Sequence, residues 1–253
     1  MILVMKKRTL IAAILILAIL LAAFAGMAAA GVFEDAAAKN RLVPVYSVAT
    51  EEKKVALTFD AAWGADQTRL IMDTVEQYGF KCTFFLTGFW AEENRELVKE
   101  IYDRGHLIGN HSASHKHLNE LDKDSLASEI DSVNALINEI TGETPRYFRA
   151  PYGEYDNTLI ETLSSKNMQC IQWSVDSLDW KGISSSEIAE RVVNGLEPGA
   201  IVLSHNAGEH IVDALPLILL SIQNKGMSAV RLDELVYPDD YTIDSRGVQI
   251  KNT

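Results

Sequence analysis

The sequence contains two histidines four positions apart, His111 and His115, within Gly-Asn-His-Ser-Ala-Ser-His after a short apolar run. Asp60, Arg149 and His205 each end another apolar run. Two neutral imidazoles at this separation can bind one divalent ion, on one helix face or across a tight loop, and leave coordination positions for water and substrate. Histidine pairs of this kind often serve only in packing. A functional interpretation therefore depends on the acid, the arginine and the third histidine reaching the same place.

The composition is that of a folded protein: 253 residues with 47% apolar side chains, enough for one large domain or two small ones. The formal net charge is −12 and the sequence has no basic stripe, which excludes nucleic acid as a partner because its phosphates would be repelled. The two cysteines, Cys82 and Cys170, fall in separate expected strands, so we interpret both as buried free thiols. The oligomeric state is left open.

The amino terminus has the pattern of an export segment. Basic residues at 6–8 precede an uncharged stretch at 9–33, and three alanines at 28–30 offer a cleavage site. The apolar stretch approaches bilayer-spanning length, so a cleaved signal peptide and an uncleaved membrane anchor both remain open. Either way the rest of the chain lies outside the cytoplasm, with membrane contact only through this segment. We expect a signal or anchor at 1–31, a linker at 32–52, a catalytic domain at 53–237 and a tail at 238–253.

After the leader, apolar β-rich runs alternate with helical patterns. The predicted strands are 54–59, 82–87, 107–110, 146–149, 168–174, 200–204 and 228–232. The predicted helices are 66–78, 92–104, 122–140, 156–166, 185–194 and 212–224. Strict alternation implies parallel strands joined by right-handed crossovers, which form either an open doubly wound sheet or a barrel.

The polar residues at the strand ends favour the barrel. Six of them lie at or just beyond the carboxyl end of a different strand, the face where such barrels assemble active sites: Asp60, Thr87, His111, Arg149, Asp176 and His205. In an open sheet they would be spread along a longer edge. We therefore predict an α/β fold, a distorted seven-stranded (β/α) barrel similar to a TIM barrel, in a single domain.

Five short motifs follow one another along this region: Thr58-Phe59-Asp60, His111-Ser112-x-x-His115, Arg149-Ala150-Pro151-Tyr152-Gly153, Asp176-x-x-Asp179-Trp180 and Leu203-Ser204-His205. In order and spacing they resemble the motifs of the polysaccharide deacetylases of the NodB-homology type, carbohydrate esterase family four. The similarity covers residues 53–235. The version Thr-Phe-Asp-Ala-Ala-Trp-Gly, together with the leader, is most similar to the sporulation-associated subgroup of spore-forming bacteria.

The resemblance implies an enzyme that hydrolyses the acetamide of N-acetylated sugars in peptidoglycan or a chitin-like polymer. In such an enzyme a divalent metal, for which we expect zinc, polarises the carbonyl and activates a water. By match to the motifs, Asp60 would be the base that accepts the water's proton. His111 and His115 would hold the metal, and His205 would protonate the departing amine.

Further residues receive supporting roles from the same resemblance. Asp179 would raise the pKa of His205, and Arg149 would keep Asp60 ionised. The backbone N–H of Tyr152 would help to bind the tetrahedral oxyanion. Three apolar side chains would contact the substrate, although each also has a plain packing explanation: Trp63, Trp180 and Leu203.

One position departs from the family pattern. The base is usually followed by a second aspartate that completes an Asp-His-His metal site, but here that position is Ala61. A metal held by two imidazoles and water should bind more weakly, because a ligand and a compensating charge are both lost. Three outcomes are open: water fills the gap, Asp60 moves onto the metal, or the site stays empty.

These residues leave alternatives to an active deacetylase. The chain could be a catalytically weak or inactive carbohydrate-binding protein of the envelope, as Ala61 suggests. A glycosidase using Asp176 and Asp179 as paired carboxylates would leave the histidine pair without a role. A metalloprotease is disfavoured because the sequence has no His-Glu-x-x-His.

Overall fold

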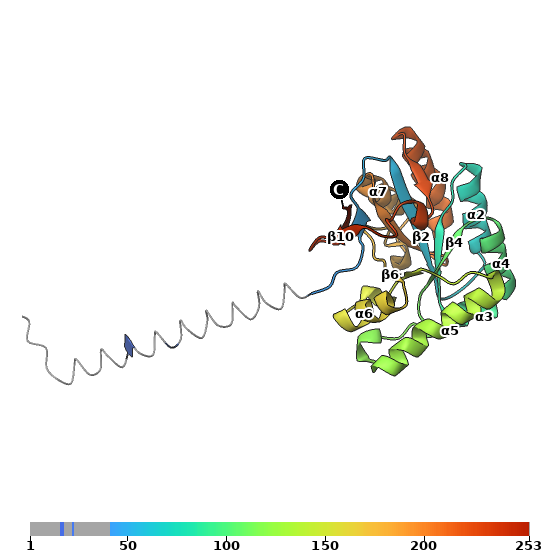
Figure 1. Cartoon of the computed structure of the whole chain (residues 1–253). Coiled ribbons are helices and arrows are strands. Elements are labelled where there is room, and N and C mark those ends of the chain that lie inside the picture. The colour runs from blue at the N-terminus through green and yellow to red at the C-terminus, as the bar shows by residue number, and fades with distance from the viewer. Residues whose placement is uncertain (1–15, 18–21, 23–40, 253) are drawn as a thin grey trace, which may run out of the picture. The chain divides into compact units, whose positions relative to one another are not determined.

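The structure, a computed structural model, describes residues 16–17, 22 and 41–252 (Figure 1). The residues from Val43 onward form one compact unit. The expected signal or anchor lies almost entirely outside the described residues, as do residues 32–40 of the expected linker. Among the described residues, no helix combines the length and apolar character that a membrane crossing requires.

A curled sheet of parallel strands forms the centre of the compact unit, with β2 (Lys54–Ala61) in its middle (Figure 1). The strand order is β6-β5-β4-β3-β2-β8-β7, and β9 pairs with the first residues of β2. The ends of this order, β6 and β7, are not paired with each other, so the sheet is a half-barrel. The remaining bounds are β3 Thr83–Leu86, β4 Leu107–Asn110, β5 Tyr147–Phe148, β6 Gln169–Cys170, β7 Val175–Asp176, β8 Ile201–His205 and β9 Ser228–Val230.

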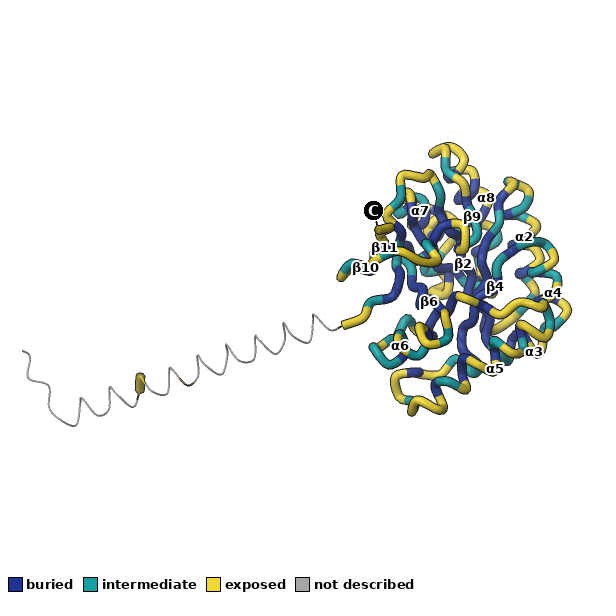
Figure 2. Tube along the Cα trace, viewed as in Figure 1, coloured by how far each residue is buried: buried dark blue, intermediate teal, exposed yellow. Residues whose placement is uncertain are grey.

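Amphipathic helices surround the sheet and bury their apolar faces against it (Figure 2). Two of their starts follow from side-chain caps: Asp122 accepts the N–H of Ser125, and Ser184 forms the predicted capping box with Glu187. The helices are α2 Thr68–Gln77, α3 Gly88–Glu93, α4 Arg95–Asp103, α5 Lys123–Thr141, α6 Asn157–Ser165, α7 Ser185–Gly195 and α8 Ile211–Asn224.

The predicted α/β fold with a barrel-like parallel sheet is confirmed, with two local differences. The predicted strand 168–174 contains only β6 and an isolated bridge at Ile171, and β7 begins just beyond it at Val175. The predicted helix 92–104 begins only at Arg95. Asn94, with φ −125° and ψ 37°, breaks the helical path between α3 and α4. Cys82 and Cys170 are buried and free, as predicted.

A second, small sheet joins the two ends of the compact unit. It consists of β1 (Ser47–Val48), β11 (Val248–Lys251) and β10 (Tyr241–Ile243). The residues just before and within β1 also make isolated bridges to the main sheet region, Val45 with Ile171 and Ser47 with Ala200. The segments expected as a linker and a tail therefore carry strands that cover the open side of the half-barrel.

Candidate active site

A cavity of about 700 Å³ lies at the carboxyl ends of the central strands. Most of the site residues predicted from the sequence line it: Asp60, Trp63, His111, His115, Tyr152, Trp180, Leu203 and His205. The two others, Arg149 and Asp179, are fully buried and contact lining residues from behind. Residues far apart in the chain thus meet at one end of the sheet because parallel strands end together there.

Asp60 and Arg149 form a buried ion pair beneath the cavity. Arg149 Nη1 lies 2.8 Å from Asp60 Oδ1 and also donates to Thr58 Oγ1 at 2.8 Å. Its Nη2 donates to the carbonyl of Gln172 at 3.1 Å, and the guanidinium lies 4.2 Å from the Phe85 ring centroid. Burial alone would raise the pKa of Asp60, but the charges of Arg149, His111 and His205, with the hydrogen bond from Arg149, together outweigh burial and hold that pKa below its usual value. Asp60 is therefore a carboxylate at neutral pH.

His111 and His115 lie in a loop rather than on a helix. Their ring centroids are 5.0 Å apart. Ser112 and His115 both have positive φ angles, 67° and 54°, a conformation that is costly for residues other than glycine. This backbone turn brings the two imidazoles together across four positions, the tight-loop alternative that the sequence had left open.

Side chains from α5 and β4 hold this loop, and sequence reasoning missed them. Glu129 on α5 accepts the N–H and the hydroxyl of Ser114, at 2.8 and 2.5 Å. Asn110 accepts the N–H of Ser112 and donates to the carbonyl of Ile130 on α5. Through Glu129 and Asn110, the loop is hydrogen-bonded to α5, and these hydrogen bonds offset the cost of its positive φ angles.

The protonation of the two histidines suits metal binding. His111 Nδ1 must donate to the Arg149 carbonyl, 2.8 Å away, so its Nε2 carries a lone pair and faces Asp60 Oδ2 at 3.5 Å. His115 Nδ1 is buried and has no hydrogen-bond partner among the described residues. Burial lowers the pKa of His111, and burial together with the charge of His111 lowers that of His115 to about 4. Both rings are neutral at pH 7, as ligands must be.

These two nitrogens fit a divalent metal as a two-histidine site. His115 Nδ1 is buried without a hydrogen-bond partner among the described residues, and the hydrogen bond from His111 Nδ1 fixes the tautomer of that ring. Each imidazole therefore has a nitrogen that could bind a metal. No cluster of three or more His, Cys, Asp or Glu suited to a metal occurs within 41–252. Ala61 is fully buried in the hydrophobic cluster and supplies no donor.

His205 and Asp179 form a second acid–base pair across the cavity from the histidine loop. Asp179 Oδ1 lies 2.7 Å from His205 Nδ1, and its Oδ2 accepts the N–H of His205 at 2.7 Å. Burial lowers the pKa of His205, but the hydrogen bond and charge of Asp179 more than offset it, and the net pKa is raised. With Nδ1 bound to Asp179, the other ring nitrogen faces the cavity.

The aromatic residues form the rim of the cavity. Trp63 and Trp180 are 64% and 59% exposed, values that argue against a pure packing role for either ring. Trp63 and Tyr152 meet His115 edge-on, with centroids 5.0 and 4.7 Å away. Tyr152 has φ +59°, and its ring stacks on His117, which pairs with Glu154 at 2.8 Å. His117 thus has a partner of its own.

The glycosidase alternative finds no geometric support. Asp176 lines the cavity, but its Oδ1 accepts the N–H of Leu178 at 2.9 Å. Asp179 is 1% exposed and bound to His205, so the two aspartates do not form the exposed carboxylate pair that a glycosidase needs. Leu203 is buried and lines the cavity floor as part of β8.

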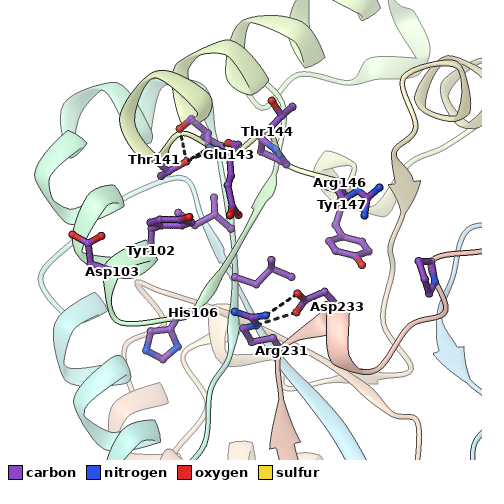
Figure 3. A pocket seen from close by; sticks show the side chains of 15 residues that line it. Tyr102, Asp103, His106, Thr141, Glu143, Thr144, Arg146, Tyr147, Arg231 and Asp233 are labelled. Carbon is purple, nitrogen blue, oxygen red and sulfur yellow. Dashed lines mark hydrogen bonds and ion pairs between the residues drawn. The ribbon is translucent and has the colours of Figure 1, made fainter.

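A second hollow of about 670 Å³ lies near the amino ends of β4 and β5, away from these groups (Figure 3). Arg231 there makes two hydrogen bonds to Asp233, at 3.0 and 2.9 Å, and Thr141 bonds the backbone of Glu143 (Figure 3). Size alone therefore does not identify the site. Asp60, His111, His115 and His205 lie together at the carboxyl ends, whereas His106 is the one histidine among the described residues that line this second hollow.

Comparisons with known proteins agree with this arrangement. The polysaccharide deacetylase family model matches residues 47–171. A peptidoglycan-N-acetylglucosamine deacetylase of Bacillus cereus is 37% identical over 186 residues, which cover 72% of this chain and 68% of that protein. A crystal structure of a peptidoglycan N-acetylglucosamine deacetylase superimposes with a TM-score of 0.73 at 34% identity, covering 76% of this chain and 91% of that one.

The chain belongs to the polysaccharide deacetylase family, carbohydrate esterase family four. The resemblance inferred from the five motifs is thereby confirmed, and so is its implication of a hydrolase that acts on the amide of N-acetylated sugars.

The structure is also similar to that of a pseudoenzyme of the same family from Bacillus anthracis, with a TM-score of 0.74 at 27% identity, covering 83% of this chain and 73% of that one. A mutant of that pseudoenzyme with restored enzymatic activity has the same TM-score at 31% identity, covering 78% of this chain and 71% of that one. The family thus includes members that keep the fold without the activity.

Proposed function

We propose that this chain deacetylates N-acetylated sugars of peptidoglycan, with Asp60 as base and His205 as acid. The single observation that supports it most strongly is that one cavity holds both a base and an acid. Asp60 is ionised beside Arg149, and His205 has a raised pKa beside Asp179. Amide hydrolysis needs both, one to accept a proton from water and one to give a proton to nitrogen. The peptidoglycan deacetylases among the relatives support the choice of polymer.

The reaction follows from the positions of these groups. Asp60 takes a proton from water as the water oxygen bonds to the acetamide carbonyl carbon. The Tyr152 N–H donates to the oxyanion that forms. His205 then gives its cavity-facing proton to the nitrogen as the C–N bond breaks. The products are acetate and a free amine.

A divalent metal, with zinc as our choice, would be held by His111 and His115. When bound, it supplies charge that polarises the acetamide carbonyl and lowers the pKa of water. Arg149 holds the base, Asp60, in its ionised form at the same edge of the cavity. Because position 61 is alanine, we expect weaker binding than a site with a third protein ligand would give.

We further propose that the protein acts outside the cytoplasm, in the envelope of a spore-forming bacterium. The basic-then-apolar amino terminus and the Thr-Phe-Asp-Ala-Ala-Trp-Gly motif support this location and subgroup. The peptidoglycan-N-acetylmuramic acid deacetylase PdaA of Bacillus subtilis, 29% identical over 201 residues, is consistent with it.

The test is acetate release from peptidoglycan and from N-acetylglucosamine oligomers by the purified chain supplied with zinc, cobalt or manganese. We expect Asp60→Asn to abolish release and Asp66→Asn, an exposed change six positions on, to leave it intact. Absence of release with every metal would favour the second candidate, a carbohydrate-binding protein without turnover. Ala61 and the similarity to a pseudoenzyme motivate that candidate.

A further inference from the structure

Tyr152, whose backbone N–H is the proposed oxyanion donor, lies in a short turn, Pro151–Gly153. Its φ of +59° and that of Gly153, +70°, are both left-handed. Glycine adopts such angles freely, but tyrosine does so at a cost in free energy, because its Cβ crowds the backbone. The conformation of Tyr152 therefore needs contacts that hold it.

The inner side of this turn is held through its backbone. Gln172 Nε2 donates to the carbonyl of Gly153 at 3.1 Å, and the carbonyl of Gln172 accepts from Arg149 Nη2. These hydrogen bonds end at Gly153, the residue after Tyr152. Tyr152 itself is 57% exposed, so burial in the core does not fix its side chain. A restraint on Tyr152 must come from the outer side of the turn.

On the outer side, two further side chains close over Tyr152. The His117 ring stacks on the Tyr152 ring, with centroids 4.4 Å apart and an angle of 16° between the ring planes. His117 Nδ1 lies 2.8 Å from Glu154 Oε2, and Glu154 follows Tyr152 by two positions. An imidazole Nδ1–H donates to a carboxylate whether the ring is neutral or charged. His117 is thus attached to the turn twice, at the ring of Tyr152 and at the carboxylate of Glu154.

The backbone of His117 is anchored in the same core as the turn. Leu118, the next residue, is buried in one hydrophobic cluster with Ala150, which precedes the turn. The carbonyl of His117 accepts the N–H of Glu120 at 3.2 Å. The imidazole therefore projects from a fixed backbone and can restrain the more exposed tyrosine.

We propose that His117 and Glu154 are positioning residues for the deacetylation, which hold the Tyr152 backbone in its left-handed conformation and so keep its N–H fixed as an oxyanion donor. The proposal rests on the role that the proposed function gives to the Tyr152 N–H. The oxyanion exists only in the transition state and the intermediate, so the N–H contributes little to binding of the substrate. Loss of the support should therefore lower kcat and leave KM nearly unchanged.

The kinetic test uses the full-length chain loaded with zinc and the N-acetylglucosamine hexamer as substrate. His117→Ala should lower kcat about three- to tenfold, the loss of one aromatic contact, and change KM by less than about twofold. His117→Phe keeps a flat ring for stacking and should retain at least about half of kcat. Glu154→Ala should lower kcat about two- to threefold, as is typical of an exposed pair.

Matched controls change the same residue types elsewhere. His210→Ala removes a partly exposed histidine that lies 3.9 Å from the carboxylate of Glu209. Glu161→Ala removes an exposed glutamate from α6. Both should leave kcat unchanged. A higher KM at unchanged kcat in His117→Ala would mean that His117 contacts the substrate, and it would overturn the proposal.

The conformation of Tyr152 can be measured without turnover, which separates this proposal from the proposed function. In nuclear magnetic resonance spectra, the cross-peak between the N–H and Hα protons of one residue is strong when φ is near +60°, because the two protons then lie closest. We expect a strong Tyr152 cross-peak in the unchanged protein and in His117→Phe, and a weaker one in His117→Ala. Weakening without acetate release from the unchanged protein would support the restraint and reject the reaction. An equally strong cross-peak in His117→Ala would overturn the proposal, whatever the change in kcat.

Discussion

Asp60 and His205 lie at the same cavity, and a buried neighbour of opposite charge favours the charged form of each. Arg149, fully buried, stabilises the charged form of Asp60. Asp179, also buried, stabilises the charged form of His205. The two neighbours are therefore the residues through which the pH dependence of the proposed reaction can be tested.

Asp179→Asn should move the alkaline limb of the pH profile of kcat to lower pH. The asparagine keeps one oxygen that can accept from His205 Nδ1, but the negative charge that raises the pKa of His205 is lost. The acid form of His205 then disappears at a lower pH than in the unchanged protein. Acetate release measured between pH 5 and 10 would show the shift. Asp176→Asn, the same change in the same loop, should leave the limb where it is, and an unmoved limb in Asp179→Asn would exclude His205 as the acid.

Ala61→Asp should tighten zinc binding about tenfold, equivalent to about 1.4 kcal/mol, because it restores a carboxylate at the position that the family uses as a ligand. Ala61 is fully buried, so the new charge should destabilise the metal-free protein and make zinc raise Tm by more than it does in the unchanged protein. Competition with a chelating dye and thermal unfolding with and without zinc measure both effects. Ala61→Asn is the control, because asparagine has nearly the same size as aspartate but carries no charge. Unchanged zinc affinity in Ala61→Asp would show that the missing carboxylate does not limit binding.

At the scale of elements, α5 fixes the geometry of the histidine loop. Its buried face carries Leu126, Ile130 and Val133, and Glu129 stands in that same apolar stripe. The helix thus presents one carboxylate toward the loop, where it meets Ser114 between the two histidines. Asn110, at the end of β4, ties the other end of the loop to the same helix. Strand and helix together hold two imidazoles that the strained backbone alone would not keep in place.

Glu129→Ala should weaken zinc binding about 10- to 100-fold, as is typical of residues that orient metal ligands. It should also lower the free energy of unfolding by about 1–3 kcal/mol, because the Ser114 N–H loses its acceptor. Chelator competition and urea unfolding measure the two effects separately. Glu139→Ala removes an exposed glutamate from the same helix and is the matched control. If zinc affinity were equal in the two variants, α5 would not position the loop.

Elements were predicted best from the sequence where a hydrophobic pattern repeats. Features that depend on one side chain or on a contact distant in the chain were predicted worst. Strand ends located Asp60, Arg149 and His205 correctly, because hydrophobic runs end where the sheet does. Glu129 was missed although its signal was present, a charge within the apolar stripe of a helix. The early end of β6 at Cys170 had no such signal, since the run 168–174 reads as one strand, whereas Ile171 pairs with Val45, far away in the chain.

At the scale of the whole molecule, the open side of the half-barrel is covered by the two ends of the compact unit. Val45 exchanges hydrogen bonds with both sides of Ile171, accepting from Gln172 at 2.7 Å and donating to Cys170 at 2.9 Å. Val48 donates to Gly199 at 3.0 Å, next to the start of β8. β11 then pairs with β1 from the outside. The half-barrel is thus completed by residues outside the region of the five motifs.

Where the segment at Val48 packs on the half-barrel, Gly199 leaves no room for a side chain. Its φ is +85°, and a Cβ there would lie 1.8 Å from the Val48 carbonyl oxygen, an impossible contact with backbone. Gly142, at the end of α5, has nearly the same φ of +84° but open space around the Cβ position. Gly142→Ala should therefore cost only the backbone strain, about 1–2 kcal/mol. Gly199→Ala should add the displacement of β1 and exceed it by about 3 kcal/mol or more. Urea unfolding of the two variants measures the difference, and equal losses would mean that the contact between Val48 and Gly199 does not hold the barrel closed.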